Sequence, residues 1–355
     1  MGDAALPRQP WIETPLVESA TLSKIAGCRI FLKLELLQPS GSFKSRGIGN
    51  FIRTASLDPE NRDKDLHFYN SSAGNAGLAA VIAARDLGYP CSIVVPHTTK
   101  PMMKRKLQAA GAAAVIQQGN SWAEADSYLR ETFINNQEAT KNKNIYVPPF
   151  DHLAVWDGAA TMVPEIEAQL PPRNSETSAF PADVIICSVG GGGLFNGIIK
   201  GLDASLSHKR TPKAKDVHVL AVETKGTDSL AHSLRAGRLE TLAAITSQAT
   251  SLGARRVSSQ TLKYAQAPPT GIKVVSVVGS DAEAARGVVT TADELRFEVE
   301  LACGISMDIA TGERLKQAVQ GLSPDSRVVV IVCGGSNITA EMIAEYRQQL
   351  HDGWE

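Results

Sequence analysis

Short apolar runs alternate with amphipathic stretches along most of this 355-residue chain. The runs rich in branched apolar residues predict buried strands, at residues 29–37, 66–70, 91–95, 113–117, 145–147, 183–188, 217–222, 273–278 and 327–333. Stretches with helical spacing lie between most of them, including residues 44–54, 75–87, 100–110, 122–134, 193–202 and 338–350. This alternation predicts an α/β fold with parallel sheets covered by helices on both faces.

The length of the chain favours two domains over one. A polar and proline-rich interruption at residues 170–181 separates two groups of strand–helix units and predicts a surface connection. The formal net charge is −1, which gives no global field to attract nucleic acid or an anionic membrane. No apolar run approaches membrane-spanning length, and residues 1–6 lack the core of a signal peptide.

The five cysteines are scattered, and most lie inside apolar runs, as Cys187 and Cys333 do. This distribution predicts reduced thiols in a cytoplasmic protein rather than a disulfide framework. No spacing of cysteine and histidine suggests a zinc site.

Lys44 is the most unusually placed charged residue of the chain. It follows Ser-Gly-Ser-Phe at residues 40–43 and begins the helical periodicity of residues 44–54. Ser40 and Ser42 are suitable N-cap residues, so we expect a helix to begin here. The positive end of the helix dipole disfavours a cation and would lower the pKa of the lysine. Such an amine suits Schiff-base chemistry with a carbonyl or with pyridoxal phosphate, although most lysines are only surface charges.

A run of small residues follows the strand at 66–70, where ligands of parallel sheets bind. It reads Ser-Ser-Ala-Gly-Asn-Ala-Gly from Ser71 to Gly77 and precedes an alanine-rich helix. Small residues expose consecutive N–H groups at a helix start, and such groups bind carboxylates or phosphates. Asn75 adds an amide able to bond a ring oxygen. A capped turn without a ligand is the alternative interpretation.

Two glycine-rich loops follow later strands. The four glycines Gly190 to Gly193 sacrifice much backbone entropy, which is rarely tolerated unless a ligand approaches the main chain. Their N–H groups, placed before a helix, indicate a phosphate site. The sequence Cys-Gly-Gly-Ser-Asn at residues 333–337 closes the last strand. Taken alone, it is explained better as a core cysteine followed by a glycine turn.

The tetraglycine loop also suggests a dinucleotide-binding turn, but its spacing does not fit. That fingerprint needs glycines at the first, third and sixth positions. Counting from Gly190, the sixth residue is Phe195, and counting from Gly191 it is Asn196. The acidic residue Glu223 also comes later than the usual distance of about 20 residues. We therefore reject a nicotinamide site of this type.

The four motifs, taken together and in this order, resemble those of the serine/threonine dehydratase family. These are fold-type II pyridoxal-phosphate (PLP) enzymes, and the similarity is greatest to the eukaryotic type of L-serine dehydratase. The resemblance extends from Thr14-Pro15-Leu16 to the C-terminal helix. It implies a tryptophan synthase β-like fold of two parallel-sheet α/β domains with the cofactor between them. Residues 38–154 would form the smaller, inserted domain, and residues 1–37 with 155–355 the larger, PLP-binding one.

The resemblance also implies roles for individual residues. Lys44 would form the Schiff base with PLP, and Phe43 would pack on its ring. Asn75 would bond its 3-oxygen, and Cys333 would face its pyridine nitrogen. The backbone N–H groups of Gly190, Gly191, Gly192, Gly193 and Leu194 would hold the phosphate. The substrate carboxylate would be bound by Ser72, Ala73 and the N–H of Ala76, beside Asn75.

The implied reaction is the conversion of L-serine to pyruvate and ammonia, and of L-threonine to 2-oxobutanoate. The substrate amine would displace Lys44, which would then remove the Cα proton, and the cofactor phosphate would protonate the leaving hydroxyl. A neutral thiol at Cys333 would leave the pyridine nitrogen unprotonated and favour elimination. Relatives with biosynthetic threonine activity usually carry serine at this place, so Cys333 favours the serine enzyme.

Members of the family also hold a monovalent cation, usually potassium. The matching residues are Glu223, as a carboxylate ligand, and the carbonyls of Thr227, Leu252 and Ala254. A solvated glutamate at a strand end is the alternative. The family further implies a homodimer with a small hydroxyamino-acid substrate.

Two other functions remain open at this point. One is a β-replacement enzyme of the cysteine synthase type, although those relatives carry Thr-Ser-Gly-Asn-Thr-Gly where this chain has residues 71–77. The other is a catalytically silent, ligand-binding homologue. The joint retention of Lys44, Asn75 and Cys333 argues against it.

Overall fold

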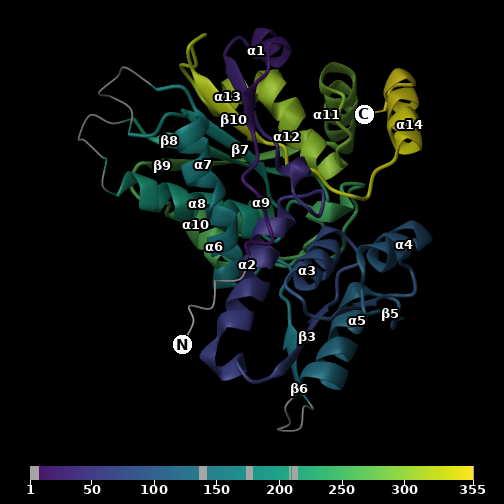
Figure 1. Ribbon diagram of the computed structural model, residues 1–355. Coiled ribbons are helices and arrows are strands. Elements are labelled where there is room, and N and C mark those ends of the chain that lie inside the picture. The colour runs from purple at the N-terminus through teal and green to yellow at the C-terminus, as the bar shows by residue number, and fades with distance from the viewer. Residues whose placement is uncertain (1–7, 136–141, 173–178, 208, 210–214, 355) are drawn as a thin grey trace. The chain divides into compact units, whose positions relative to one another are not determined.

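The computed structural model of the chain describes residues 8–135, 142–172, 179–207, 209 and 215–354 (Figure 1). The chain divides into two compact units. The smaller unit comprises Met1–Ile12 and Gln38–Gly158, and the larger unit comprises Glu13–Leu37 and Ala159–Glu355. Residues 1–6, where we expected no signal peptide, and residues 173–178 of the expected surface connection lie outside the described part.

The smaller unit is built on a parallel sheet with the strand order β5-β4-β3-β6. Its strands are β3 (Asp65–Asn70), β4 (Cys91–Val95), β5 (Ala114–Gln117) and β6 (Asn142–Tyr146). Its helices are α2 (Lys44–Leu57), α3 (Asn75–Asp86), α4 (Pro101–Ala110), α5 (Trp122–Leu129), a π-helical turn (Arg130–Ile134) and a 3-10 turn (Pro59–Asn61). Helix α6 (Leu153–Ala160) contains the residue at which this unit ends.

Strand periodicity decides which helices cover each face of this sheet. Phe68 and Ile93 point to one face and pack with residues of α2, α3 and α4. Their neighbours Tyr69 and Val94 point to the other face, where they pack with Ala125 of α5. Successive side chains of a strand alternate between faces, so both faces of a parallel sheet must be buried.

The larger unit contains a six-stranded sheet with the order β1-β2-β10-β7-β8-β9. Its strands are β1 (Leu16–Glu18), β2 (Arg29–Lys33), β7 (Val184–Ser188), β8 (Val217–Thr224), β9 (Ile272–Gly279) and β10 (Arg327–Ile331). All neighbours pair in parallel except β1, which pairs antiparallel with β2. The α/β fold with parallel strands in two units is therefore confirmed, and β1 is an addition that the sequence pattern did not reveal.

Helices surround this larger sheet, as Figure 1 shows. They are α1 (Ala20–Ala26), α7 (Met162–Gln169), α8 (Gly193–Leu206), α9 (Ser229–Ala236), α10 (Ser259–Gln266), α11 (Asp281–Leu295), α12 (Leu301–Thr311), α13 (Glu313–Ala318) and α14 (Ala340–His351), with 3-10 turns at Glu35–Leu37 and Thr250–Leu252. Helices α11 and α12 approach closely because both carry glycines at their contact. A Cβ atom added to Gly287 would lie 1.9 Å from the carbonyl oxygen of Gly304.

Several expected elements end earlier or later than their sequence patterns indicated. The run at 29–37 is a strand only to Lys33, after which the chain forms a 3-10 turn. The run at 327–333 leaves the sheet at Ile331, so Cys333 follows the strand instead of closing it. The helix expected at 122–134 continues from α5 into a π-helical turn. Apolar composition alone does not mark where backbone pairing stops.

The two units differ from the expected domains near the N-terminus. We expected residues 1–37 in the larger domain, whereas Ile12 belongs to the smaller unit. Local contacts give the reason. A Cβ atom on Gly49 of α2 would lie 2.8 Å from Pro10, so this residue pair packs closely. Ile12 exchanges two hydrogen bonds with the side chain of Gln38, at 3.0 and 2.8 Å.

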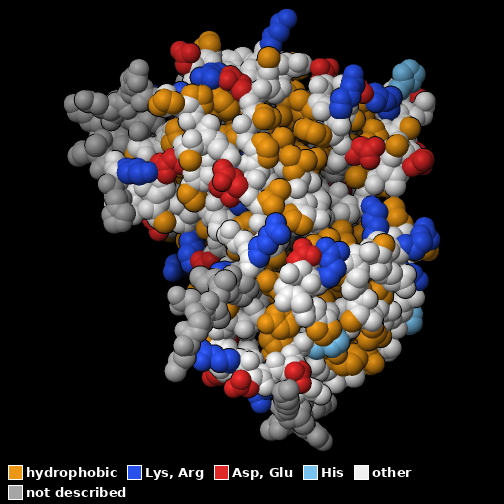
Figure 2. Space-filling view, viewed as in Figure 1, with side chains coloured by type: hydrophobic (Ala, Val, Ile, Leu, Met, Phe, Trp, Pro, Cys, Tyr) orange, Lys and Arg blue, Asp and Glu red, His pale blue; other side chains and the backbone are white. Residues whose placement is uncertain are grey.

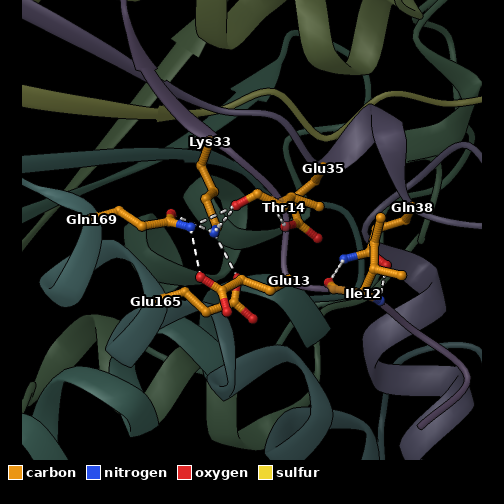
Figure 3. A network of polar contacts seen from close by, with 8 residues as sticks. All are labelled: Ile12, Glu13, Thr14, Lys33, Glu35, Gln38, Glu165 and Gln169. Carbon is orange, nitrogen blue, oxygen red and sulfur yellow. Dashed lines mark hydrogen bonds and ion pairs between the residues drawn. The ribbon is translucent and has the colours of Figure 1, made fainter.

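A polar network around the buried Lys33 holds the first residues of the larger unit in place (Figure 3). The Nζ of Lys33, at the end of β2, donates hydrogen bonds to the carbonyl of Thr14 at 2.6 Å and to Glu165 at 2.6 Å. It also donates to the side-chain oxygen of Gln169 at 2.9 Å. The hydroxyl of Thr14 donates in turn to Glu35 at 2.6 Å. Lys33 is fully buried, so its charge depends on these partners.

Charged side chains of both signs are interspersed on the face that Figure 2 shows. Within the described residues, no helix has the length and apolar character needed to cross a membrane.

Candidate cofactor and substrate site

Lys44 begins helix α2, as expected, but its amine is held in a different way. The residue before the helix is Phe43, which makes no side-chain capping bond. The hydroxyl of Ser40 is instead paired with that of Ser45 at 2.8 Å. Ser40 and Ser42 are therefore not N-caps, and this part of the expectation was wrong. The hydroxyl of Ser45, inside the first turn of the helix, forms the hydrogen bonds that hold the tight turn before α2.

The amine of Lys44 has two neighbours in the smaller unit. Its Nζ donates a hydrogen bond to the carbonyl of Pro149 at 2.7 Å and lies 5.3 Å from the ring centre of Phe43. Burial lowers the pKa of Lys44 to about 8. The expected direction of the pKa shift is confirmed, while its cause is removal of the amine from water rather than the helix dipole. Pro149 was missed by sequence reasoning, although its position shortly after β6 was a signal.

The loop after β3 carries the residues expected to bind the substrate carboxylate. Ser72, Ala73 and Asn75 are partly buried, and Ala76 is buried within α3. The N–H of Ser72 donates to the side chain of Asn70 at 2.8 Å, and the N–H of Gly74 donates to the hydroxyl of Ser72 at 3.2 Å. The loop is thus a hydrogen-bonded turn that presents the start of α3.

Gly77 shows how closely this loop is folded onto its helix. A Cβ atom there would lie 1.9 Å from the carbonyl oxygen of Ser72, so only glycine fits. The side chain of Asn70 also donates to the carbonyl of Val147 at 2.7 Å, which ties the end of β3 to the segment after β6. In the smaller unit, Lys44 and Pro149 therefore meet near the carboxyl ends of two adjacent strands.

The tetraglycine loop connects β7 to α8 in the larger unit. Val189 donates to the carbonyl of Val222 at 2.7 Å, and the first bond within α8 runs from Asn196 to the carbonyl of Gly192 at 2.8 Å. The N–H groups before Asn196 have no acceptor in their own helix, as at any helix start. Such groups bind anions.

Two of the four glycines also pack closely against other parts of the protein. Gly192 has a φ of +96°, and a Cβ atom there would lie 1.8 Å from the hydroxyl of Thr261. A Cβ atom on Gly190 would lie 3.1 Å from the Cα of Leu252. The glycine run therefore reflects close packing at two positions, in addition to any phosphate that its N–H groups bind.

A buried polar cluster supports the tetraglycine loop, and no motif in the sequence indicated it. Asn196 donates to the hydroxyl of Ser258 at 3.0 Å and accepts from the hydroxyl of Thr261 at 3.0 Å. Those two hydroxyls lie 2.8 Å apart, and the N–H of Ser258 donates to the carbonyl of Gly191 at 3.1 Å. These hydrogen bonds hold the backbone of the tetraglycine loop in one conformation.

Cys333 lies next to the same sheet edge of the larger unit. Its Sγ is 3.3 Å from the hydroxyl of Ser188, the last residue of β7. Cys333 also shares a hydrogen bond with the thiol of Cys303, which, together with burial, raises the pKa of Cys303 well above its ordinary value. All five cysteines are free and buried. Ser188 and Cys303 were not singled out from the sequence.

Glu223 is fully buried at the end of β8, so the alternative of a solvated glutamate was wrong. Its two oxygens accept the N–H groups of Leu230 and Ala231, both at 2.8 Å. Burial raises the pKa of Glu223 to about 8, although these hydrogen bonds oppose the shift. The carboxylate therefore satisfies the start of α9, a role that the sequence did not indicate.

The other residues expected at a cation site lie nearby in the larger unit. Thr227 is fully buried, and its carbonyl accepts the N–H of Ser229 at 3.0 Å. The carbonyl of Leu252 accepts the N–H of Ala254 at 2.8 Å. The hydroxyl of Ser229 is buried and has no hydrogen-bond partner among the described residues. Those residues contain no group of three or more His, Cys, Asp or Glu side chains that could hold a metal ion.

Comparisons with known proteins agree on one family. The family described as pyridoxal-phosphate dependent enzyme matches residues 8–334. An L-serine dehydratase of Saccharomyces cerevisiae is 40% identical over 342 residues, which cover 96% of this chain and 97% of the relative. A catabolic L-serine/threonine dehydratase of S. cerevisiae strain S288c is 37% identical over 336 residues, covering 94% and 89%.

Among solved structures, a fungal L-serine ammonia-lyase from Rhizomucor miehei is similar over nearly its whole length. The TM-score is 0.83 and the sequence identity is 35%, with 96% of this chain and 99% of that chain covered.

Proposed function

Because the chain belongs to the family of pyridoxal-phosphate dependent enzymes, we propose that it is an L-serine ammonia-lyase. It converts L-serine to pyruvate and ammonia, and it accepts L-threonine as a second substrate, giving 2-oxobutanoate. The observation that carries this proposal is the amine of Lys44, whose pKa burial lowers to about 8. This lysine directly follows Ser-Gly-Ser-Phe in the sequence. Half of such an amine is neutral near pH 8, and the neutral amine is the nucleophile that Schiff-base chemistry requires.

The residues present fit PLP. Lys44 offers a neutral amine to its aldehyde, and Phe43 offers a ring surface beside that amine. Asn75 would bond the 3-oxygen, and Cys333 would face the pyridine nitrogen. The N–H groups at the start of α8, from Gly190 to Leu194, would hold the phosphate, since a helix start binds anions. When bound, PLP supplies the electron sink that stabilises negative charge at Cα.

The protein itself supplies positioning and proton transfer. Lys44 Nζ removes the proton from Cα of the substrate, and the carbonyl of Pro149 fixes the direction of the amine. The N–H groups of Ser72, Ala73 and Ala76 hold the substrate carboxylate at the start of α3, beside Asn75. Holding the carboxylate and the amine at two points leaves the Cα–H bond and the β-hydroxyl in a defined orientation, which favours elimination of water.

Cys333 distinguishes this site from one that keeps the pyridine nitrogen protonated. Ser188 and Cys303 both form hydrogen bonds with its thiol, so the sulfur is held in a buried position. A neutral partner does not stabilise a positive charge on the nitrogen as a carboxylate would. This arrangement favours rapid loss of the β-substituent over long-lived charge storage, and so supports a lyase.

A monovalent cation, potassium, is the second component of the proposal. Glu223 and the carbonyls of Thr227, Leu252 and Ala254 are the expected ligands. The unpartnered, buried hydroxyl of Ser229 supports a ligand at this place and adds a candidate oxygen that we had not expected. Gly190 of the phosphate loop packs on Leu252, so a cation held here would stiffen that loop.

The proposal extends to a homodimer that acts in the cytoplasm, in amino-acid catabolism. The buried, reduced state of the five cysteines supports a reducing compartment.

Absorption spectroscopy and a pyruvate assay test the proposed function. The purified protein, supplied with PLP, should show the visible band of a protonated Schiff base and produce pyruvate from L-serine. Lys44→Ala should lose both, whereas Lys24→Ala, which removes an exposed lysine of α1, should lose neither. A colourless protein that takes up no PLP would contradict the proposal. Binding of PLP without turnover would indicate a silent homologue, and sulfide-dependent product formation would indicate β-replacement.

A further inference from the structure

A buried aspartate stands behind the loop that is proposed to bind the substrate carboxylate. Asp126 lies on α5, and its side chain is almost entirely removed from water. Its Oδ1 accepts a hydrogen bond from the hydroxyl of Ser71 at 2.6 Å. Ser71 is the first residue after β3 and directly precedes Ser72. A hydrogen bond to an ionised acceptor is about twice as strong as one between neutral groups, so this is a firm anchor.

Asp126 has further partners that neutralise it. The hydroxyl of Tyr146 donates to the same Oδ1 at 2.8 Å, and the Nε of Arg130 donates to Oδ2 at 2.8 Å. Arg130 also stacks on the ring of Tyr146, with its guanidinium carbon 3.8 Å from the ring centre. Arg130 therefore neutralises the charge of Asp126. A substrate carboxylate bound by the neighbouring loop is then not repelled by an unpaired aspartate.

The contacts of Ser71 and Ser72 fix the loop from two sides. The side chain of Asn70 accepts the N–H of Ser72 at 2.8 Å, while Asp126 holds the side chain of Ser71. Ser71 is buried, and its hydroxyl has the carboxylate of Asp126 and the hydroxyl of Tyr146 as partners. With both bonds in place, the backbone on either side of Ser72 has one orientation, and so do the N–H groups that follow.

We propose that Asp126 is a positioning residue for the substrate carboxylate, acting through Ser71 on the N–H groups of Ser72, Ala73 and Ala76. This inference rests on the proposed function, because it concerns the same substrate. It assigns the two hydroxyls on Oδ1 different roles. The bond from Ser71 orders the binding loop, whereas the main role of the bond from Tyr146 is to attach Asp126 of α5 to β6.

Steady-state kinetics of matched variants test this role. Ser71→Ala and Tyr146→Phe each remove one hydroxyl from the same carboxylate oxygen. Ser71→Ala and Asp126→Ala should raise KM for L-serine about ten-fold, which corresponds to the loss of about 1.4 kcal/mol of binding. Their kcat should change less than about two-fold, because Lys44 and the tetraglycine loop are untouched. Tyr146→Phe should leave KM within about two-fold of the wild type.

The conservative variant separates positioning from stability. Asp126→Asn keeps an oxygen that accepts the hydroxyl of Ser71 but loses the ion pair with Arg130, so it should destabilise the protein while keeping KM near the wild-type value. The double variant Ser71→Ala/Asp126→Ala should raise KM no further than either single change. Equal effects of Ser71→Ala and Tyr146→Phe on KM would overturn the proposal, as would a fall in kcat at constant KM.

Hydrogen exchange gives a readout that does not depend on turnover. Backbone amides of residues 72–76 should exchange about ten-fold faster in Asp126→Ala and Ser71→Ala than in the wild type, and at the wild-type rate in Tyr146→Phe. If the wild type does not turn over L-serine, the proposed function is wrong and the positioning role falls with it. If the wild type is active but Asp126→Ala changes neither KM nor exchange, only the positioning role is wrong.

Discussion

The side-chain nitrogen of Lys44 donates a hydrogen bond to the carbonyl oxygen of Pro149 at 2.7 Å. A carbonyl carries no full negative charge, so it orients the nitrogen with less stabilisation of the ammonium than a carboxylate would give. Burial therefore dominates and lowers the pKa of Lys44 to about 8. A nucleophile that must attack a carbonyl near neutral pH benefits from this combination.

We predict that Lys44 becomes reactive at a lower pH than other lysines in the cofactor-free protein. Its pKa is lowered from 10.5 to about 8, so half of it is neutral near pH 8. Competitive labelling with acetic anhydride, followed by peptide mass spectrometry, should show the rate at Lys44 rising between about pH 7 and 9 and then levelling off. Nα-acetyl-lysine added to the same reaction is the control, and its rate should still rise above pH 9. The same pH dependence for both amines would contradict the prediction.

Gly192 should not tolerate a side chain. Gly192→Ala places a Cβ atom at a φ of +96° and 1.8 Å from the hydroxyl of Thr261. We expect a loss of about 3 kcal/mol or more in the free energy of unfolding, measured in urea, together with weaker uptake of PLP. Gly237→Ala is the matched control, since Gly237 has a φ of +69° and open space around it, and should cost about 1 kcal/mol. Thr261→Ala should recover part of the loss, and equal costs for the two glycines would contradict this account.

Breaking the ion pair between buried Lys33 and half-buried Glu165 should cost more stability than replacing both residues (Figure 3). Lys33→Met leaves Glu165 and Gln169 without their shared donor, and we expect it to lower the free energy of unfolding by about 3–5 kcal/mol. Lys33→Met/Glu165→Met should lose less than the sum of the two single changes, because no unpaired charge remains. Chemical denaturation of the four proteins measures this coupling. Additive effects would show that the two side chains do not stabilise each other.

Glu223→Gln should remove the effect of potassium. The amide has one oxygen for the N–H groups of Leu230 and Ala231, so the start of α9 should weaken by about 1–3 kcal/mol. Serine turnover of the wild type should be higher in potassium chloride than in tetramethylammonium chloride of equal ionic strength, and Glu223→Gln should lose this difference. Asp228→Asn, which also removes a negative charge before α9, should keep it. Stimulation of Glu223→Gln equal to that of the wild type would contradict the assigned ligand.

Local sequence patterns predicted the elements of this fold well because strand and helix periodicities are properties of short segments. The strand at 91–95 and the start of α2 at Lys44 agree with the structure. The caps of α2 were wrong because Ser40 and Ser45 pair with each other, and several residues compete for each hydrogen bond at a turn. Strand β1 has only three residues, too few for any period to be recognised.

The α/β architecture, the family and the lysine that would carry the chemistry could be predicted from the sequence, because each depends on contiguous motifs. The contacts that support those motifs became visible only in the folded chain. The contacts of Pro149 with Lys44, of Thr261 with Gly192 and of Asp126 with Ser71 join residues 105, 69 and 55 positions apart. No periodicity extends over such separations, and burial, which lowers the pKa of Lys44, exists only once the chain has folded around the amine.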